Sequence, residues 1–300
     1  MKRQLLGVAA FMLALSAHAQ DNPLWMRYCA ISPDGTSIAF TYKGDIYTVP
    51  VNGGKAAQIT TNAAHDTHPV WSPDGKQIAF ASDRMGSMDI FVVDREGGIP
   101  KRLTTHSGNE TPVAFKDADH ILFLANVMPS AEDAQFPSGQ FQQVYEVSTT
   151  GDRPVMFSSM PMEDISINKT GNALLYHDKK GYEDPWRKHH TSSITRDIWL
   201  CSLDGKRSYR KLTSFNGEDR TPVWASDGKS FYYLSEEKGS FNVFKRALDG
   251  TSSTQLTHHT KHPVRFLTAA DNGTLCYGYD GEIYTMKEGT EPRKVQISIL

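Results

Sequence analysis

Histidine is the residue type in this chain that most invites a chemical interpretation, because its imidazoles gather in three short segments. One segment holds His65 and His68, the next the pair His189 and His190, and the last the trio His258, His259 and His262. A metal site would also need carboxylates or cysteines at a ligand spacing that recurs with these imidazoles. None recurs in that way, so the sequence predicts neither a metal site nor a cofactor.

The chain also lacks the short motifs that mark a nucleophile or a phosphate cradle. It contains no Gly-x-Ser-x-Gly elbow, no His-Glu-x-x-His, no Walker loop and no dinucleotide fingerprint. A central calcium site would need inward-facing acids near one axis. Five acids could each qualify: Glu110, Glu163, Asp164, Glu218 and Asp219. They follow no coordinated pattern, so we assign no catalytic residue.

Two insertions carry aromatic and charged residues of the kind found in binding loops. They run through 126–142 and 177–196, and the segment 215–220 is expected beside the second of them. The alternative is that these are solvated loops whose aromatic side chains cap the edge of a sheet. The candidate residues for binding a peptide or protein partner are Tyr182, Trp186, Arg187, His189, His190, Phe215, Glu218, Asp219, Arg220, His65, His68 and His262.

A sixfold repeat supplies the elements that must position these loops. Each copy has a strand that ends in a turn like Ser-Pro-Asp-Gly, a second apolar strand, a strand like Asp-Ile-Tyr and a close like Leu-Thr. The turns begin at Ser32, Ser72, Lys116, Asn168, Ala225 and Ala270, and the third strands at Asp45, Asp89, Gln143, Asp197, Asn242 and Glu282. A spacing of roughly 40 to 57 residues with four short strands is that of a propeller blade.

The sequence therefore predicts an all-β fold, a six-bladed β-propeller with four-stranded antiparallel blades. The blades span roughly 24–61, 66–105, 110–158, 162–214, 219–258 and 262–300. Because the first blade starts with its own strand at 27–31 and the last ends with its own at 294–299, we expect the ring to close by packing, without a shared strand. Successive turns of such a blade alternate between the two faces of the ring, so both insertions emerge on one face.

Two sets of apolar residues are assigned to packing. The aromatic residues Trp71, Phe115, Trp224 and Phe266 recur before the first turns and are predicted to pack between blades. Cys29, Cys201 and Cys276 have neither the even count nor the spacing of a disulfide or zinc framework. Buried thiols are the expected state, although Cys29 and Cys276 would lie in adjacent blades of a closed ring and could form a bond in an oxidising compartment.

The repeat identifies a family resemblance. The run Ser-Pro-Asp-Gly-x-x-Ile-Ala-Phe, followed by Asp-Ile-Tyr, Gly-Gly and Leu-Thr, resembles the propeller repeats of the TolB family and of tricorn-type peptidases. TolB proteins carry an α/β domain before the propeller, for which this chain has no room. The chain most resembles the amino-terminal propeller of a bacterial tricorn-type serine peptidase of the S41 family. That resemblance implies a second propeller, a PDZ domain and a catalytic domain downstream, none of which is present here.

The first 19 residues resemble a secretory signal peptide. A charged start at 1–3 precedes an apolar stretch at 5–17, which is too short for a membrane span, and a small-x-small cleavage site at 17–19. No cysteine follows that site, so we expect export to the periplasm without a lipid anchor. The chain has 32 basic and 34 acidic side chains, a balance that gives no electrostatic case for nucleic acid or anionic lipid as a partner.

Two functions are consistent with these patterns. The resemblance implies a non-catalytic propeller of an exported tricorn-like serine protease, which guides peptide substrates or products to or from a separate catalytic domain. The alternative is a standalone periplasmic propeller of the TolB type that binds a protein partner. In both cases we expect the chain alone to have no peptidase activity.

Overall fold

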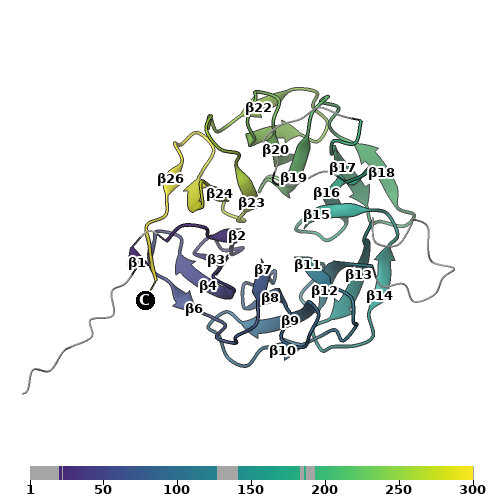
Figure 1. Cartoon of the computed structure of the whole chain (residues 1–300). Helices are drawn as coiled ribbons and strands as arrows, with labels where there is room; N and C mark the ends of the chain where they lie inside the picture. Colours follow the sequence, from purple (N-terminus) through teal and green to yellow (C-terminus); the bar gives the residue numbers. More distant parts are fainter. Residues whose placement is uncertain (1–19, 22, 127–140, 183–185, 187–192, 300) are drawn as a thin grey trace, which may run out of the picture.

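Six antiparallel sheets arranged in a ring form the body of the molecule, as Figure 1 shows in a computed structural model. The structure describes residues 20–21, 23–126, 141–182, 186 and 193–299. Within this part each blade consists of four strands arranged in chain order, and in blade one a short strand of another sheet intervenes before the fourth. The prediction of a six-bladed propeller with four-stranded antiparallel blades is confirmed. No helix that could cross a membrane occurs among these residues.

The strands of each blade run from the central axis outward in chain order. Blades one to three are built from β2 (Arg27–Ile31), β3 (Ser37–Tyr42), β4 (Asp45–Pro50) and β6 (Ala57–Gln58), from β7 (Asp66–Trp71), β8 (Gln77–Ser82), β9 (Asp89–Asp94) and β10 (Lys101–Arg102), and from β11 (Glu110–Phe115), β12 (His120–Ala125), β13 (Gln143–Ser148) and β14 (Val155–Ser158).

The second half of the ring repeats this order. Blades four to six are built from β15 (Met162–Ile167), β16 (Ala173–Asp178), β17 (Ile198–Ser202) and β18 (Ser208–Lys211), from β19 (Asp219–Trp224), β20 (Ser230–Ser235), β21 (Asn242–Ala247) and β22 (Ser253–Gln255), and from β23 (Arg265–Ala269), β24 (Leu275–Tyr279), β25 (Glu282–Met286) and β26 (Arg293–Lys294).

The recurring turn between the first two strands is held by its own side chains. In blade one the Ser32 hydroxyl donates to Asp34 Oδ1 at 2.6 Å, and the same oxygen accepts the Thr36 amide at 2.9 Å. Gly35 completes the turn at a φ of 73°. Such a turn needs an acceptor at the third position and a residue that tolerates a positive φ at the fourth, which explains the Asp-Gly pair.

The recurring threonine of the closing segment ties the outer strand of its blade to the third strand. The hydroxyl oxygens of Thr60, Thr104, Thr213 and Thr257 accept backbone amides of Ile46, Ile90, Ile198 and Val243 at 2.8–3.0 Å. All four threonines are buried. A buried amide without a partner is costly, so this position of the repeat requires a hydroxyl.

Apolar side chains fill the wedges between neighbouring blades. Trp71 and Trp224 pack there as predicted, and their indole nitrogens donate to the carbonyls of Ala30 and Ser166 in the preceding blade at 2.8 and 2.9 Å. Phe115 is also buried between blades. Phe266 differs from the other three, because it lies four residues before its turn instead of one, and it is only partly buried against the core.

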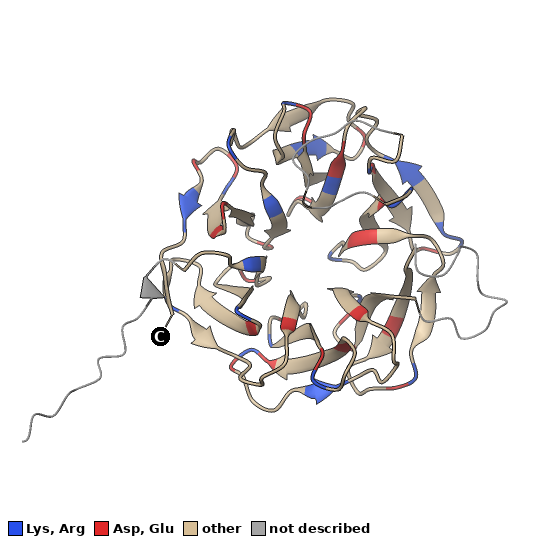
Figure 2. Cartoon of the chain, in the orientation of Figure 1, with Lys and Arg blue, Asp and Glu red and all other residues tan. Residues whose placement is uncertain are grey.

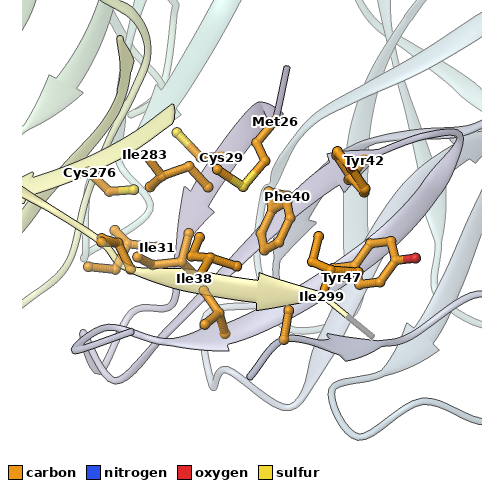
Figure 3. Close-up of a cluster of buried hydrophobic side chains, with 14 of the residues drawn as sticks. Met26, Cys29, Ile31, Ile38, Phe40, Tyr42, Tyr47, Cys276, Ile283 and Ile299 are labelled. Carbon is orange, nitrogen blue, oxygen red and sulfur yellow. The ribbon is translucent and has the colours of Figure 1, made fainter. Parts of the chain in front are cut away.

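The wedge between blades six and one closes the ring. Figure 3 shows Ile31, Phe40, Cys276 and Ile283 converging there, and Ile299 covers the same core. Cys29 and Cys276 both belong to this core, and all three cysteines are buried and unbridged. As predicted, no blade in the described part of the chain borrows a strand from the other end.

A small three-stranded sheet reinforces this closure. The strand β27 (Ile297–Ile299) pairs with β1 (Gln20–Asp21) on one side and with β5 (Gly54–Lys55) on the other. The amides of Gly54 and Ala56 donate to the carbonyls of Gln296 and Ser298 at 2.8 and 2.9 Å. We call this sheet the latch. It joins residues 20–21 and 297–299 to blade one by backbone hydrogen bonds. The sequence analysis places 294–299 in the last strand of blade six, and for residues 297–299 that assignment is wrong.

Candidate functional site at the central channel

Every inner strand breaks its pairing with the second strand near its midpoint. In five of the six blades the break places a residue other than glycine in the left-handed conformation, at φ values between 49° and 58°. We call these five the collar residues: Tyr28, His68, Asp164, Thr221 and Phe266. In blade three the break lies between Pro112 and Ala114, and a proline ring cannot adopt a positive φ.

A bulge turns a side chain away from the direction that simple alternation would give it. All five collar residues line a central channel with a volume of about 1030 Å³, which is bounded by residues from the inner strands of all six blades. A left-handed conformation is uncommon for residues with a side chain and costs free energy. Its repetition at one level of the ring identifies the channel as the candidate site.

Aromatic collar residues make one wall of the channel. The rings of Tyr28 and His68 lie 3.7 Å apart and those of Tyr28 and Phe266 lie 4.9 Å apart, measured between centroids. Burial lowers the pKa of His68 to about 4, although the nearby Asp164 carboxylate opposes that shift. His68 is therefore neutral at physiological pH and acts as an aromatic surface.

A buried ion network makes the opposite wall, where Figure 2 shows charged positions on the inner strands of blades four and five. The Arg196 guanidinium lies 3.3 Å from Glu163 and 2.9 Å from Glu218, and it is almost completely buried. Burial opposes ionisation of Glu163, but His177, Arg196 and Lys179 together hold its pKa well below the usual range. The wall is therefore charged across the physiological pH range and internally compensated.

Arg220 extends this network toward blade five. Its guanidinium lies 3.6 Å from Glu218 and 4.0 Å above the ring of Phe241. Burial lowers its pKa to about 10, against the favourable charge of Glu218. The arginine still carries its charge at neutral pH, so it contributes a fixed cation to the channel wall.

Trp186, from the insertion of blade four, reaches across the ring to the mouth of the channel. Its indole lies between two guanidinium groups, with Arg27 at 5.0 Å and Arg265 at 4.8 Å from the ring centroid. Its carbonyl accepts a hydrogen bond from Arg265 at 2.9 Å, and its ring contacts Phe266 edge-on at 6.2 Å. This predicted binding residue therefore lines the channel, where it contacts blades one and six.

The other predicted residues fall into separate environments. Arg187, His189 and His190 lie outside the described residues. Tyr182 is 87% exposed, Phe215 is half-buried, and His65 is exposed with its amide bonded to Asp83. His262 lies 3.4 Å from Asp280 away from the channel lining. Of the predicted histidines that the structure describes, it brings only His68 into the channel.

Glu218, Asp219 and Arg220 differ from the expectation of an exposed binding loop. All three side chains are buried, because Asp219 and Arg220 begin the inner strand β19, at the predicted blade boundary, and Glu218 contacts the buried guanidinium of Arg196. Glu218 and Arg220 are part of the ion network. Asp219 lies instead between the blades, where burial raises its pKa to about 7 although Ser235 and Thr213 donate hydrogen bonds to it.

Sequence reasoning missed several channel residues. Tyr28, Thr221, His177 and Arg196 were not proposed for binding, Asp164 was considered only as a calcium ligand, and Phe266 was assigned to packing. The available signal was positional, because each collar residue lies four residues before the first residue of the repeated turn. Among the described residues, no three His, Cys, Asp or Glu side chains form a cluster that could hold a metal ion.

Comparison with known proteins now assigns the family. The family model of the tricorn protease N-terminal beta propeller domain matches residues 23–292. The chain belongs to this tricorn N-terminal propeller family. It is 25% identical over 279 residues to tricorn protease homolog 1 of Streptomyces coelicolor, and 24% identical over 289 residues to the tricorn protease of Thermoplasma acidophilum. Each match covers 92% of this chain, which spans about a quarter of either relative.

Solved structures agree with the tricorn-type fold. The crystal structure of the tricorn protease superposes with a TM-score of 0.75 over 91% of this chain and 26% of its own, at 20% identity. TolB from Acinetobacter baumannii superposes with a TM-score of 0.65 over 90% of this chain and 63% of its own, at 16% identity.

A further relative by sequence is an uncharacterised protein of Agrobacterium fabrum. It is 34% identical over 216 residues, which are 68% of each chain.

Proposed function

We propose that this chain is the non-catalytic propeller of an exported tricorn-like serine protease, and that its channel guides peptides to or from a separate catalytic domain. The observation that carries the proposal is the channel itself, in a chain that belongs to the tricorn N-terminal propeller family. Its volume suits a short stretch of extended peptide, because ligand sites commonly measure about 300–1,000 Å³.

The two walls of the channel fit a peptide better than a uniformly charged or apolar ligand. Aromatic rings on blades one, two and six provide surface for apolar side chains, while the network on blades four and five offers hydrogen-bonding groups. A peptide presents both kinds of group along its length. Export remains part of the proposal and depends on residues 1–19, which lie outside the described part.

Peptide binding by the purified chain without residues 1–19 tests this function. Fluorescence anisotropy should show saturable binding of labelled tri- to hexapeptides, and Trp186→Ala should weaken it several-fold, because Trp186 lies at the channel mouth. Trp186→Ala also removes two cation–π contacts, worth roughly 0.5–1 kcal/mol each at an exposed site, so its unfolding temperature should fall by only a few degrees. Tyr182→Ala is the control, because Tyr182 is exposed in the same insertion but does not line the channel.

Peptidase activity is the second readout. The chain alone should not hydrolyse peptides, and hydrolysis that a serine-directed inhibitor abolishes would contradict the proposal. Absence of peptide binding in the first assay would also contradict it.

A standalone binding propeller is the alternative function. It is favoured by the Agrobacterium relative, because a match that covers the same share of both chains implies similar lengths. The mass of the endogenous protein, detected on a gel with an antibody against this propeller, distinguishes the protease from the standalone propeller. A species several-fold heavier than this chain supports the protease, and a species of about its own mass supports the standalone propeller.

A further inference from the structure

Asp164 is the collar residue that carries a negative charge. It lies in β15 at a φ of 49°, lines the channel, and has a side chain that is 49% exposed. Its carboxylate accepts a hydrogen bond from the Thr221 hydroxyl, another collar residue, at 2.7 Å. The bulges of blades four and five thus turn this carboxylate into the channel and hold it there.

The imidazole beside Asp164 does not neutralise it. His177 Nδ1 lies 3.6 Å from the Asp164 carboxylate, but that nitrogen already accepts the Thr221 amide at 3.0 Å and so carries no proton. The proton of the ring is on Nε2, which faces Glu163 at 3.2 Å. Both ring nitrogens of His177 are therefore engaged by groups other than Asp164.

The other carboxylates of the described channel lining have cationic or protonatable partners. Glu163 contacts Lys179 and Arg196, Asp271 contacts Lys169, and Asp117 contacts His120. Arg196 and Arg220 feel the charge of Asp164, but their direct ion pairs are with Glu218, at 2.9 and 3.6 Å, and Arg265 binds the carbonyl of Trp186. Asp164 thus combines access to solvent with the absence of a lysine or arginine within 4 Å among the described residues.

The aromatic wall faces Asp164 across the opening, where β2 and β15 lie on opposite sides of the ring (Figure 1). Burial raises the pKa of the Tyr28 hydroxyl, and the Asp164 charge adds to that rise against the opposing charge of Arg27. The carboxylate therefore acts electrostatically on the ring stack of Tyr28 and His68. Aromatic faces attract cations as well as apolar groups.

We propose that the channel binds a primary ammonium group on Asp164, with the apolar or aromatic group next to it resting against Tyr28, His68 and Phe266. The ligand class is an amine with an apolar substituent. Insofar as this inference rests on the proposed function, the natural form of the ligand is the free amino terminus of a short peptide with an apolar first residue. Each oxygen of the Asp164 carboxylate has a lone pair that the Thr221 hydroxyl does not occupy. An ammonium group can donate to these lone pairs while Thr221 keeps its hydrogen bond.

Calorimetric titration of the signal-free chain tests the site with a probe that does not depend on peptide transport. The probe is 2-phenylethylamine, and its neutral counterpart is 2-phenylethanol. The amine should bind at least about tenfold more tightly than the alcohol, because a hydrogen bond to a charged group is worth about one to two powers of ten in affinity.

Asp164→Asn is the decisive variant. Asparagine tolerates the left-handed conformation and can still accept the Thr221 hydrogen bond, so the fold should be kept and thermal unfolding can verify it. The amine should bind about tenfold more weakly or worse. Asp280→Asn is the matched control, because Asp280 also has a positive φ, of 52°, and an exposed side chain but does not line the channel. It should leave amine binding unchanged.

A peptide arm separates this inference from the proposed function. The tripeptide phenylalanyl-glycyl-glycine should bind and its N-acetylated form should bind at least about tenfold more weakly. If both forms bind alike, or if Asp164→Asn binds the amine as well as the native chain, the ammonium site is wrong while peptide guidance stands. If the amine binds through Asp164 but neither peptide binds, peptide guidance is wrong and the site stands. Absence of amine binding to the native chain overturns the site.

Discussion

Replacing Gly53 by alanine should open the latch, and the same change at Gly97 provides a matched control. Both glycines occupy the turn between the third and fourth strands of their blades, and both have a φ of 89°. A Cβ at Gly53 would lie 2.4 Å from the carbonyl oxygen of Gln296, whereas a Cβ at Gly97 would lie 3.6 Å from its nearest neighbour, the carbonyl oxygen of Ile59. The two variants therefore share the backbone strain and differ in the clash.

The strain costs about 1 to 2 kcal/mol in either variant. The clash at Gly53 is with backbone, so β27 must move away and the hydrogen bonds from Gly54 and Ala56 are lost, at about 1 kcal/mol each. Partial exposure of Ile297 or Ile299 adds a fraction of the ~1.5 to 3 kcal/mol that such a side chain gains on burial. We expect Gly53→Ala to lose ~2 to 3 kcal/mol more unfolding free energy than Gly97→Ala.

Urea unfolding followed by tryptophan fluorescence measures this difference, provided the transition is two-state. The melting temperatures should differ by about 6 °C, since 1 kcal/mol shifts a domain of this size by about 2–4 °C. Hydrogen exchange supplies an independent readout, because the amides of Gly54 and Ala56 should lose protection in Gly53→Ala alone. Equal stability losses in the two variants, within ~0.5 kcal/mol, would show that the latch contributes nothing to closure.

Three further predictions concern buried polar groups. Burial raises the pKa of both Glu110 and Asp219 to about 7. Near neutral pH the folded state therefore holds protons that the unfolded state has released. The free energy of unfolding should fall between pH 5 and pH 7.5, by on the order of 1 to 2 kcal/mol per carboxyl. Glu110→Gln should flatten its part of that slope in urea titrations, and an unchanged slope would refute the assignment. Arg196→Met should cost about 3 kcal/mol because it removes the guanidinium nearest to the buried Glu218. Lys76→Met, which removes an exposed ion pair, should cost under ~1 kcal/mol in the same assay. Burial raises the pKa of Cys201 and Cys276, so a maleimide should react slowly with the native chain. After unfolding it should label all three cysteines. Labelling of a single cysteine after unfolding would reveal a bond between Cys29 and Cys276.

The ring was predictable from the sequence because its determinants are local. The Ser-Pro-Asp-Gly turns and the closing threonines act within one blade, and each satisfies a requirement of a few adjacent residues. The turn position recurs six times, and this repetition determines the number of blades. The latch was not predictable in the same way, since it pairs Gly54 with Ile297 and has no counterpart in the other blades to reveal it.

The channel was less predictable for two physical reasons. A bulge adds one residue to a strand and reverses the side-chain direction that alternation implies, so the inward positions of β15 or β19 could not be read from the sequence. The ion network also joins Glu163, Arg196 and Glu218, which come from three separate segments. Trp186 was found because an aromatic residue within a charged loop is a local signal.

The antiparallel pairing of β1 with β27 has a mechanical consequence. Gln20 lies opposite Ile299, so the chain enters and leaves this strand pair at the same end. A pull applied through the two ends would load the hydrogen bonds one after another, as in unzipping, instead of all together, as in shear. The pair of β1 with β27 would therefore give way at low force. The pairing of β27 with β5 and the apolar core of the seam would keep the ring closed after β1 has come away.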